Sequence, residues 1–316
     1  MQACDNHPMH CIIAYAASAQ LPPDALEGLH LPRLKALLKR LQCTDQDCDP
    51  ADDHPPPAMP HERAHARALG WDAQGPLPWA AWQTGNTGPT AQAWITPCHW
   101  QIGMDQVFML DPASLQLGNE ESQALLQAMQ PYLQEDGLQV RWHDAVHWHA
   151  QGDLLAGWAA PSLDRVINAN VRPWITSGLP GKLVRLHSEM QMLAYHHPVN
   201  DARLARGLLP VNAFWVHGAG SLPPTQTLLA APVCLLDSLR ASALRGDVSG
   251  WRSAWQDLDA QLPGPDTADV QLTLCSESAA QHWQTRPQHW LGRLRQAFST
   301  TDTTAALRAL TEPCNS

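Results

Sequence analysis

Residues 61–65 read His-Glu-Arg-Ala-His, a spacing that in zinc peptidases brings two histidines to one face of a helix. There both imidazoles bind zinc, and the glutamate acts as general base on the metal-bound water. In this chain Pro60 makes His61 nearly the first helical residue, and Arg63 puts a charge inside the motif. The context favours a solvated surface helix, and a zinc-dependent hydrolase through His61 and His65 stays open as an alternative.

Two further sets of residues have side chains that can bind metals. His147 and His149 alternate on an expected strand and share a face, but such a pair more often flanks a packed residue, here Trp148. Cys43 and Cys48 form no C-x-x-C pair, so we expect reduced thiols in a solvated loop. The sequence also lacks a glycine-rich phosphate loop and a G-x-S-x-G nucleophile motif.

The stretch HHPVNDARLARGLLPVNAFWVHGAG, residues 196–220, concentrates polar side chains between structure-breaking residues. We expect a helix that stops at Pro198, a short helix capped by Asn200 and ended by Gly207, and then a strand. Ligands in open α/β sheets bind beyond the carboxyl ends of strands. The residues that this places at the edge of a pocket are Asn212, Trp215 and His217.

The elements that position these residues alternate between strands and helices. Hydrophobic spacing predicts helices over 31–41, 61–70, 119–137 (with Asn119 as N-cap), 181–197 and 287–298. It predicts strands over 11–18, within 91–112, and over 138–151, 210–220 and 269–278, with an acidic, proline-rich loop over 43–60. This order favours an α/β fold, a central sheet with helices on both faces.

The run from 91 to 151 reads strand, strand, helix, strand, which indicates a small α+β subdomain inserted into the larger sheet. We therefore expect residues 1–90 to form the first part of the α/β core. Residues 91–155 would form the insert, and 156–316 the second part with a C-terminal tail.

Composition excludes several function classes. The chain has 316 residues, 44% hydrophobic and 16% charged, which is typical of a globular protein. Its net charge is -10 and it has no basic run, so neither nucleic acid nor an anionic membrane surface is an expected partner. The N-terminus lacks the basic residues and long apolar run of a signal peptide, so we expect a cytoplasmic protein.

The segment LAYHHPVNDARLARGLLPVNAFWVHGAG, residues 193–220, resembles the "HPVN..R...G..PAN.IWLWG.G" signature of archaeal-type, cofactor-independent phosphoglycerate mutases of the alkaline phosphatase superfamily. The stretches at 29–41 and 99–126 resemble the helix after the first strand and the inserted subdomain of these mutases. The chain is also similar, over nearly its whole length, to a bacterial family described either as phosphoglycerate mutase or as a regulatory protein of a pathogenicity-factor gene cluster. The resemblance implies a degenerate alkaline-phosphatase-like sheet.

Mutases of this type hold two divalent cations with Asp and His side chains, which activate a serine nucleophile. The resemblance places the first Asp ligand at the end of the first strand, where this chain has CIIAYAAS. It places a late Asp-His pair after LTLCSES, where this chain has Cys275, Ser276 and Glu277. The ligands are therefore missing, and we expect no metal and no other cofactor.

Two functions remain open. One is a non-catalytic regulatory protein that binds a small phosphorylated or other anionic metabolite, or a protein partner. The other is a phosphoglycerate mutase or phosphatase-type metalloenzyme with relocated ligands. The residues that could bind a ligand in either case are Glu189, Asn200, Arg203, Asn212, Trp215, His217, His61, Glu62 and Arg63.

Overall fold

The computed structural model describes residues 9–50, 55–223, 233–264, 267, 269–285 and 302–312. These residues divide into two units, each with its own sheet. The first unit comprises the described residues up to Pro55, Met59–Trp71 and the described residues from 233 onward. The second comprises Pro56–Ala58 and residues 72–223. The insert expected over 91–155 lies inside the second unit.

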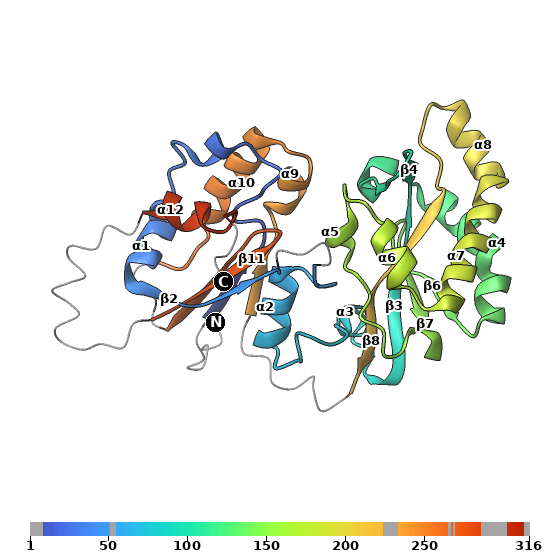
Figure 1. Cartoon of the computed structure of the whole chain (residues 1–316), viewed down its shortest axis with the longest axis horizontal. Helices are drawn as coiled ribbons and strands as arrows, with labels where there is room; N and C mark the ends of the chain where they lie inside the picture. The colour runs from blue at the N-terminus through green and yellow to red at the C-terminus, as the bar shows by residue number, and fades with distance from the viewer. Residues whose placement is uncertain are drawn as a thin grey trace. The chain divides into compact units, whose positions relative to one another are not determined.

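The first unit is a mixed α/β structure around a five-stranded sheet of order β2-β11-β10-β1-β9 (Figure 1). Strand β1 runs parallel to β9 and β10, whereas β11 is antiparallel to both β10 and β2. Its strands are β1 (Met9–Ile13), β2 (Leu41–Cys48), β9 (Val233–Leu236), β10 (Val270–Cys275) and β11 (Ala279–Thr285). Its helices are η1 (Pro23–Leu26), α1 (Pro32–Arg40), α2 (Pro60–Ala68), α9 (Arg240–Leu244), α10 (Val248–Asp259) and α12 (Thr303–Arg308).

Helices cover both faces of this sheet, as the sequence predicts. Consecutive residues Cys11, Ile12 and Ile13 of β1 are all buried, and successive side chains of a strand point to opposite faces. On one face Ile12 packs with Ala64 of α2. Figure 1 shows α1, α10 and α12 on the other side of the sheet from α2.

The second unit is built on a four-stranded antiparallel sheet of order β6-β7-β3-β8, with a separate β4-β5 hairpin. Its strands are β3 (Gly88–Cys98), β4 (Trp100–Ile102), β5 (Val107–Met109), β6 (Gln139–Trp142), β7 (Trp148–Gln151) and β8 (Ala213–Leu222). Its helices are α3 (Trp79–Thr84), η2 (Pro112–Leu115), α4 (Asn119–Glu135), η3 (Asp153–Leu155), α5 (Leu163–Val166), α6 (Arg172–Ser177), α7 (Gly181–Tyr195) and α8 (Pro198–Ala205). The core of the unit lies between the sheet and α4 and α7.

Three expectations about local structure were wrong. The segment 43–60 is not a loop throughout, because Leu41–Cys48 forms β2 by pairing with β11. The first strand ends at Ile13 rather than at 18, and Tyr15 takes a left-handed turn conformation, φ 56°. The N-cap of α4 is Gly118 rather than Asn119, with the Glu121 carboxylate accepting the Gly118 N–H at 3.1 Å.

Other segments of the chain refine the sequence expectations. Cys43 is a free thiol, but Cys48 is disulfide-bonded, which corrects the expectation for that residue. The helix expected over 287–298 lies outside the described residues, whereas α12 near the C-terminus buries Leu307. Within the part of the chain that the structure describes, no helix is both long and apolar enough to cross a membrane.

Candidate functional site

The backbone that follows β1 is covered by two tryptophan side chains of α10. Tyr15 and Ala16 are buried, and their carbonyl oxygens accept the indole N–H groups of Trp251 at 3.0 Å and Trp255 at 3.1 Å. The two tryptophans are one turn apart, so they lie on the same face of α10. The strand end where the resemblance places an acidic metal ligand is therefore occupied by aromatic rings.

The polar side chains that follow β10 hold neighbouring loops. The Ser276 hydroxyl donates to the Leu310 carbonyl at 2.7 Å and accepts the Ala279 N–H at 3.1 Å. The Glu277 carboxylate accepts the Ser18 hydroxyl and, at 3.1 Å, the Ala19 N–H. These groups join the ends of β1 and β10 and the C-terminal helix.

Beyond the same end of β1 lies a cavity of about 300 Å³. Residues of the segment 17–26 form most of its wall, and Trp251, Arg308 and Thr311 complete it. Arg308 is exposed, and its guanidinium has no hydrogen bond or ion pair within the described residues. The cavity therefore combines apolar walls with one cationic group that is open to a ligand.

The HExxH segment forms α2, but α2 is not the solvated surface helix that the sequence favoured. His61, Arg63 and His65 are at most 7% exposed. Glu62 accepts the Met59 N–H at 2.8 Å, a helix-capping contact. Among the described residues no group of three or more His, Cys, Asp or Glu side chains is arranged to hold a metal ion. Burial lowers the pKa of His65 to about 4.

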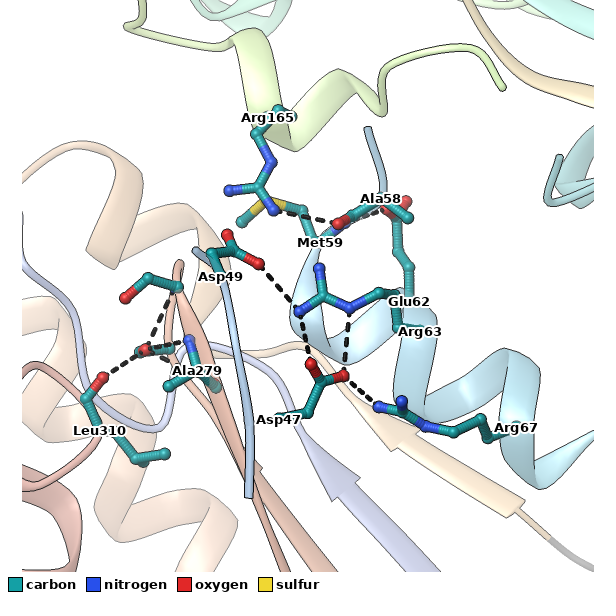
Figure 2. Close-up of polar contacts among 12 residues, drawn as sticks. Asp47, Asp49, Ala58, Met59, Glu62, Arg63, Arg67, Arg165, Ala279 and Leu310 are labelled. Carbon is teal, nitrogen blue, oxygen red and sulfur yellow. Dashed lines mark hydrogen bonds and ion pairs between the residues drawn. The ribbon is translucent and has the colours of Figure 1, made fainter. Parts of the chain in front are cut away.

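Arg63 can be buried because Asp47 of β2 and Asp49, just after this strand, neutralise it. Figure 2 shows the carboxylates of Asp47 and Asp49 facing its guanidinium, at 3.1 Å and 2.9 Å. Arg67, one turn along α2, also pairs with Asp47. Burial alone raises the pKa of Asp47, but hydrogen bonds from the two arginines outweigh burial and hold it below its usual value. The sequence interpretation of α2 as a solvated helix was wrong for this reason. The segment 43–60, expected to be a loop, supplies the carboxylates that neutralise Arg63.

The two asparagines of the 196–220 segment tie backbone segments together. Asn200 is not a helix cap, because His197 is the N-cap of α8. The Asn200 side chain instead donates to the carbonyls of Ala194 and Val211 and accepts the Val211 N–H. Asn212 bonds to both the N–H and the carbonyl of Trp100, at 2.7 and 3.0 Å. In each amide, both the oxygen and the nitrogen therefore bond to backbone groups.

The remaining candidates of the second unit also contact other parts of that unit. Trp215 donates its indole N–H to the Pro161 carbonyl at 3.0 Å, and His217 bonds to the Thr96 hydroxyl at 3.0 Å. Glu189 lies 4.0 Å from Arg185 on the surface of α7. Among the described residues, Glu189 does not line the cavity formed mainly by residues 17–26.

Arg203 is fully buried, and its guanidinium has three partners. Its Nε donates to the Leu209 carbonyl at 2.8 Å, and its terminal nitrogens bond to the Leu115 carbonyl and the Glu121 carboxylate. The exposed Arg206 pairs with the same carboxylate. Arg203 therefore fastens α8 to the start of α4.

Sequence analysis missed Trp251, Trp255 and Arg308. The four-residue spacing of the two tryptophans was the available signal, because it puts both on one helical face. No local signal identifies Arg308, since the cavity that it lines is formed mainly by residues near the N-terminus.

No family model and no curated protein matches the chain. Among solved structures, the PH0037 protein from Pyrococcus horikoshii is similar, with 11% identity, a TM-score of 0.46, and coverage of 88% of this chain and 87% of that chain. The cofactor-independent phosphoglycerate mutase from Thermoplasma acidophilum is also similar, with 14% identity, a TM-score of 0.34, and coverage of 96% and 98%.

Proposed function

We propose that this chain is a non-catalytic, phosphoglycerate mutase-like protein with a regulatory role, and that it acts by binding a small anion in the cavity beyond β1. The resemblance of residues 193–220 to the mutase signature supports the family. The polar residues of that signature contact the backbone of their own unit, which fits a segment kept for folding rather than for chemistry.

The observation that supports a loss of catalysis is that polar groups at the ends of β1 and β10 are already hydrogen-bonded within the protein. Two dications need several oxygen or nitrogen ligands, mostly charged, at the strand ends. Here the carbonyls of Tyr15 and Ala16 are taken by indoles, and Glu277 is bonded to Ser18 and Ala19. Metal activation of a serine at this position would require these contacts to break.

The cavity and Arg308 support an anionic ligand. A volume of about 300 Å³ lies at the lower end of the range for small-molecule sites. A guanidinium binds phosphate or carboxylate through two parallel N–H groups. The chain carries a net charge of -10, so a local cation is needed to attract such a ligand.

The test is thermal unfolding of the full chain with 3-phosphoglycerate, together with a mutase assay in added Mn²⁺. We expect no turnover, and a stabilisation that grows with ligand concentration, about 2.7 kcal/mol at 100 times Kd. Arg308→Gln should abolish the stabilisation. Arg245→Gln is the matched control, because Arg245 is exposed on the same unit and does not line the cavity.

Two results would contradict the proposal in different ways. Metal-dependent turnover would restore the enzyme hypothesis, whatever Arg308→Gln does. If the ligand still stabilises Arg308→Gln, or does not stabilise the wild type, the proposal that an anion binds in this cavity is wrong. Only the proposal of a non-catalytic protein would then remain.

A further inference from the structure

The wall of the cavity beyond β1 is mainly apolar. The cavity has a volume of about 300 Å³, and most of the residues that line it have aliphatic or aromatic side chains. Leu21, Leu26 and Trp251 are 8%, 8% and 1% exposed, so this part of the wall is buried. A ligand that fills the cavity therefore gains most from an apolar body of its own.

Few hydrogen-bond donors in this wall are available to a ligand. The Ser18 hydroxyl donates to the Glu277 carboxylate, and the Thr311 hydroxyl donates to the Arg308 carbonyl at 2.9 Å. The Trp251 indole N–H donates to a backbone carbonyl at 3.0 Å. Among the described side chains that line the cavity, the Arg308 guanidinium alone keeps its donors for a ligand.

The cationic part of the wall is exposed, whereas the apolar part is buried. Arg308 is the last residue of α12 and is exposed, although Leu307 before it is buried. Thr311, which also lines the cavity, is exposed as well. A bound molecule would therefore place its anionic group toward Arg308 and its apolar body among the buried side chains.

The charges around the cavity match one anionic group. A guanidinium binds a carboxylate through two parallel N–H groups. The Glu277 carboxylate contacts the wall at the Ser18 hydroxyl and, at 3.1 Å, at the Ala19 N–H. A second negative charge on the ligand would meet this carboxylate rather than a donor. A molecule with both a phosphate and a carboxylate therefore fits less well than a monoanion.

Given the anion site proposed above, on which this inference rests, we propose that the cavity selects a monocarboxylate with an apolar body, such as an arylacetate. Its carboxylate binds the Arg308 guanidinium, and its ring packs against Leu21, Leu26 and Trp251. Both parts contribute to affinity, so removing either the charge or the ring weakens binding.

The experiment is a ¹⁹F NMR titration of the full chain at pH 7 with three probes. 4-Fluorophenylacetate has both parts, 4-fluorophenylacetamide lacks the charge, and fluoroacetate lacks the ring. We expect 4-fluorophenylacetate to bind at least tenfold more tightly than either of the others. 3-Phosphoglycerate should displace it, with an affinity at least tenfold weaker.

Two variants test the two parts of the site separately. In Arg308→Gln, 4-fluorophenylacetate and its amide should bind within twofold of each other, whereas Arg245→Gln, at an exposed position outside the cavity, should keep the tenfold ratio. Ala19→Trp fills the cavity from an exposed position and should weaken binding of both probes at least tenfold.

The possible failures of this inference and of the proposed function can be distinguished. If 3-phosphoglycerate binds through Arg308 and 4-fluorophenylacetate does not bind more tightly, only the selection of an apolar monocarboxylate is wrong. If neither binds at millimolar concentrations, the proposed anion site is wrong as well. A ratio that Arg308→Gln leaves unchanged, or binding that Ala19→Trp leaves unchanged, would overturn the placement of the ligand in this cavity.

Discussion

The two buried arginines among the described residues, Arg63 and Arg203, differ in what neutralises them. Arg63 in the first unit faces two carboxylates, those of Asp47 and Asp49, whose side chains are 17% and 6% exposed. Arg203 in the second unit bonds to two backbone carbonyls and to one carboxylate. Removing Arg63 would take a shared cation from two carboxylates, whereas removing Arg203 would leave mainly neutral acceptors without donors. The contribution of a buried arginine to stability thus depends on its partners, and not on its burial alone.

The largest expected effect is that of Arg63→Met. Asp47 and Asp49 would keep their charges near the sheet after losing the guanidinium that they share, so we expect a loss of about 3–5 kcal/mol in the free energy of unfolding. Urea denaturation at pH 7 measures this. Adding Asp47→Asn should recover part of the loss, because it removes one of the two carboxylates that lose Arg63.

Arg203→Met is the comparison for that variant. We expect the free energy of unfolding to fall by about 2–3 kcal/mol, because Arg206 still pairs with Glu121 and only carbonyl groups lose their donors. A loss as large as that of Arg63→Met would show that the type of partner does not decide the cost.

We expect a loss of stability of intermediate size on acidification. It tests the first unit, where His10 and His65 are buried near α2. Burial holds the pKa of His10 and of His65 at about 4, against about 6.5 in the unfolded chain. The unfolded state therefore takes up protons first, and stability is lost as the pH falls from about 6.5 toward 4. Between pH 7 and pH 5 we expect a loss of about 1–2 kcal/mol per histidine, from urea midpoints at the two values.

The control is the pH dependence of His65→Gln rather than its absolute stability. This variant should lose less stability between pH 7 and pH 5 than the wild type, because one of the buried neutral histidines is gone. An unchanged pH dependence would mean that His65 is not kept neutral by burial.

The smallest expected effects are those of the exposed arginines in the two clusters. Arg67 is 38% exposed and Arg206 is 55% exposed, and each shares its carboxylate with a buried arginine. Solvent screens such pairs, so Arg67→Gln and Arg206→Gln should each cost less than about 1 kcal/mol in urea denaturation. A cost above 2 kcal/mol at either position would mean that the exposed arginine contributes as much to the free energy of unfolding as its buried neighbour does.

The helices were predictable wherever apolar residues repeat at helical spacing. The pattern of Leu34, Leu37 and Leu38 predicted α1, and that of Leu183, Leu186 and Met190 predicted α7. The mixed α/β class followed from the alternation of strands and helices along the chain. The ligand candidates were harder, because residue type alone does not show whether an arginine or asparagine bonds to a ligand or to its own backbone.

The sequence by itself determined which segments are amphipathic, the absence of acids at the end of the first strand, and the resemblance of residues 193–220 to a mutase signature. Only the tertiary structure decided that Leu41–Cys48 is a strand, because its pairing partner β11 lies far along the chain. That pairing positions Asp47, which allows Arg63 to be buried within a helix that looks solvated in sequence. The physical reason is that strand pairing and charge neutralisation are non-local, whereas helical periodicity is read within one segment.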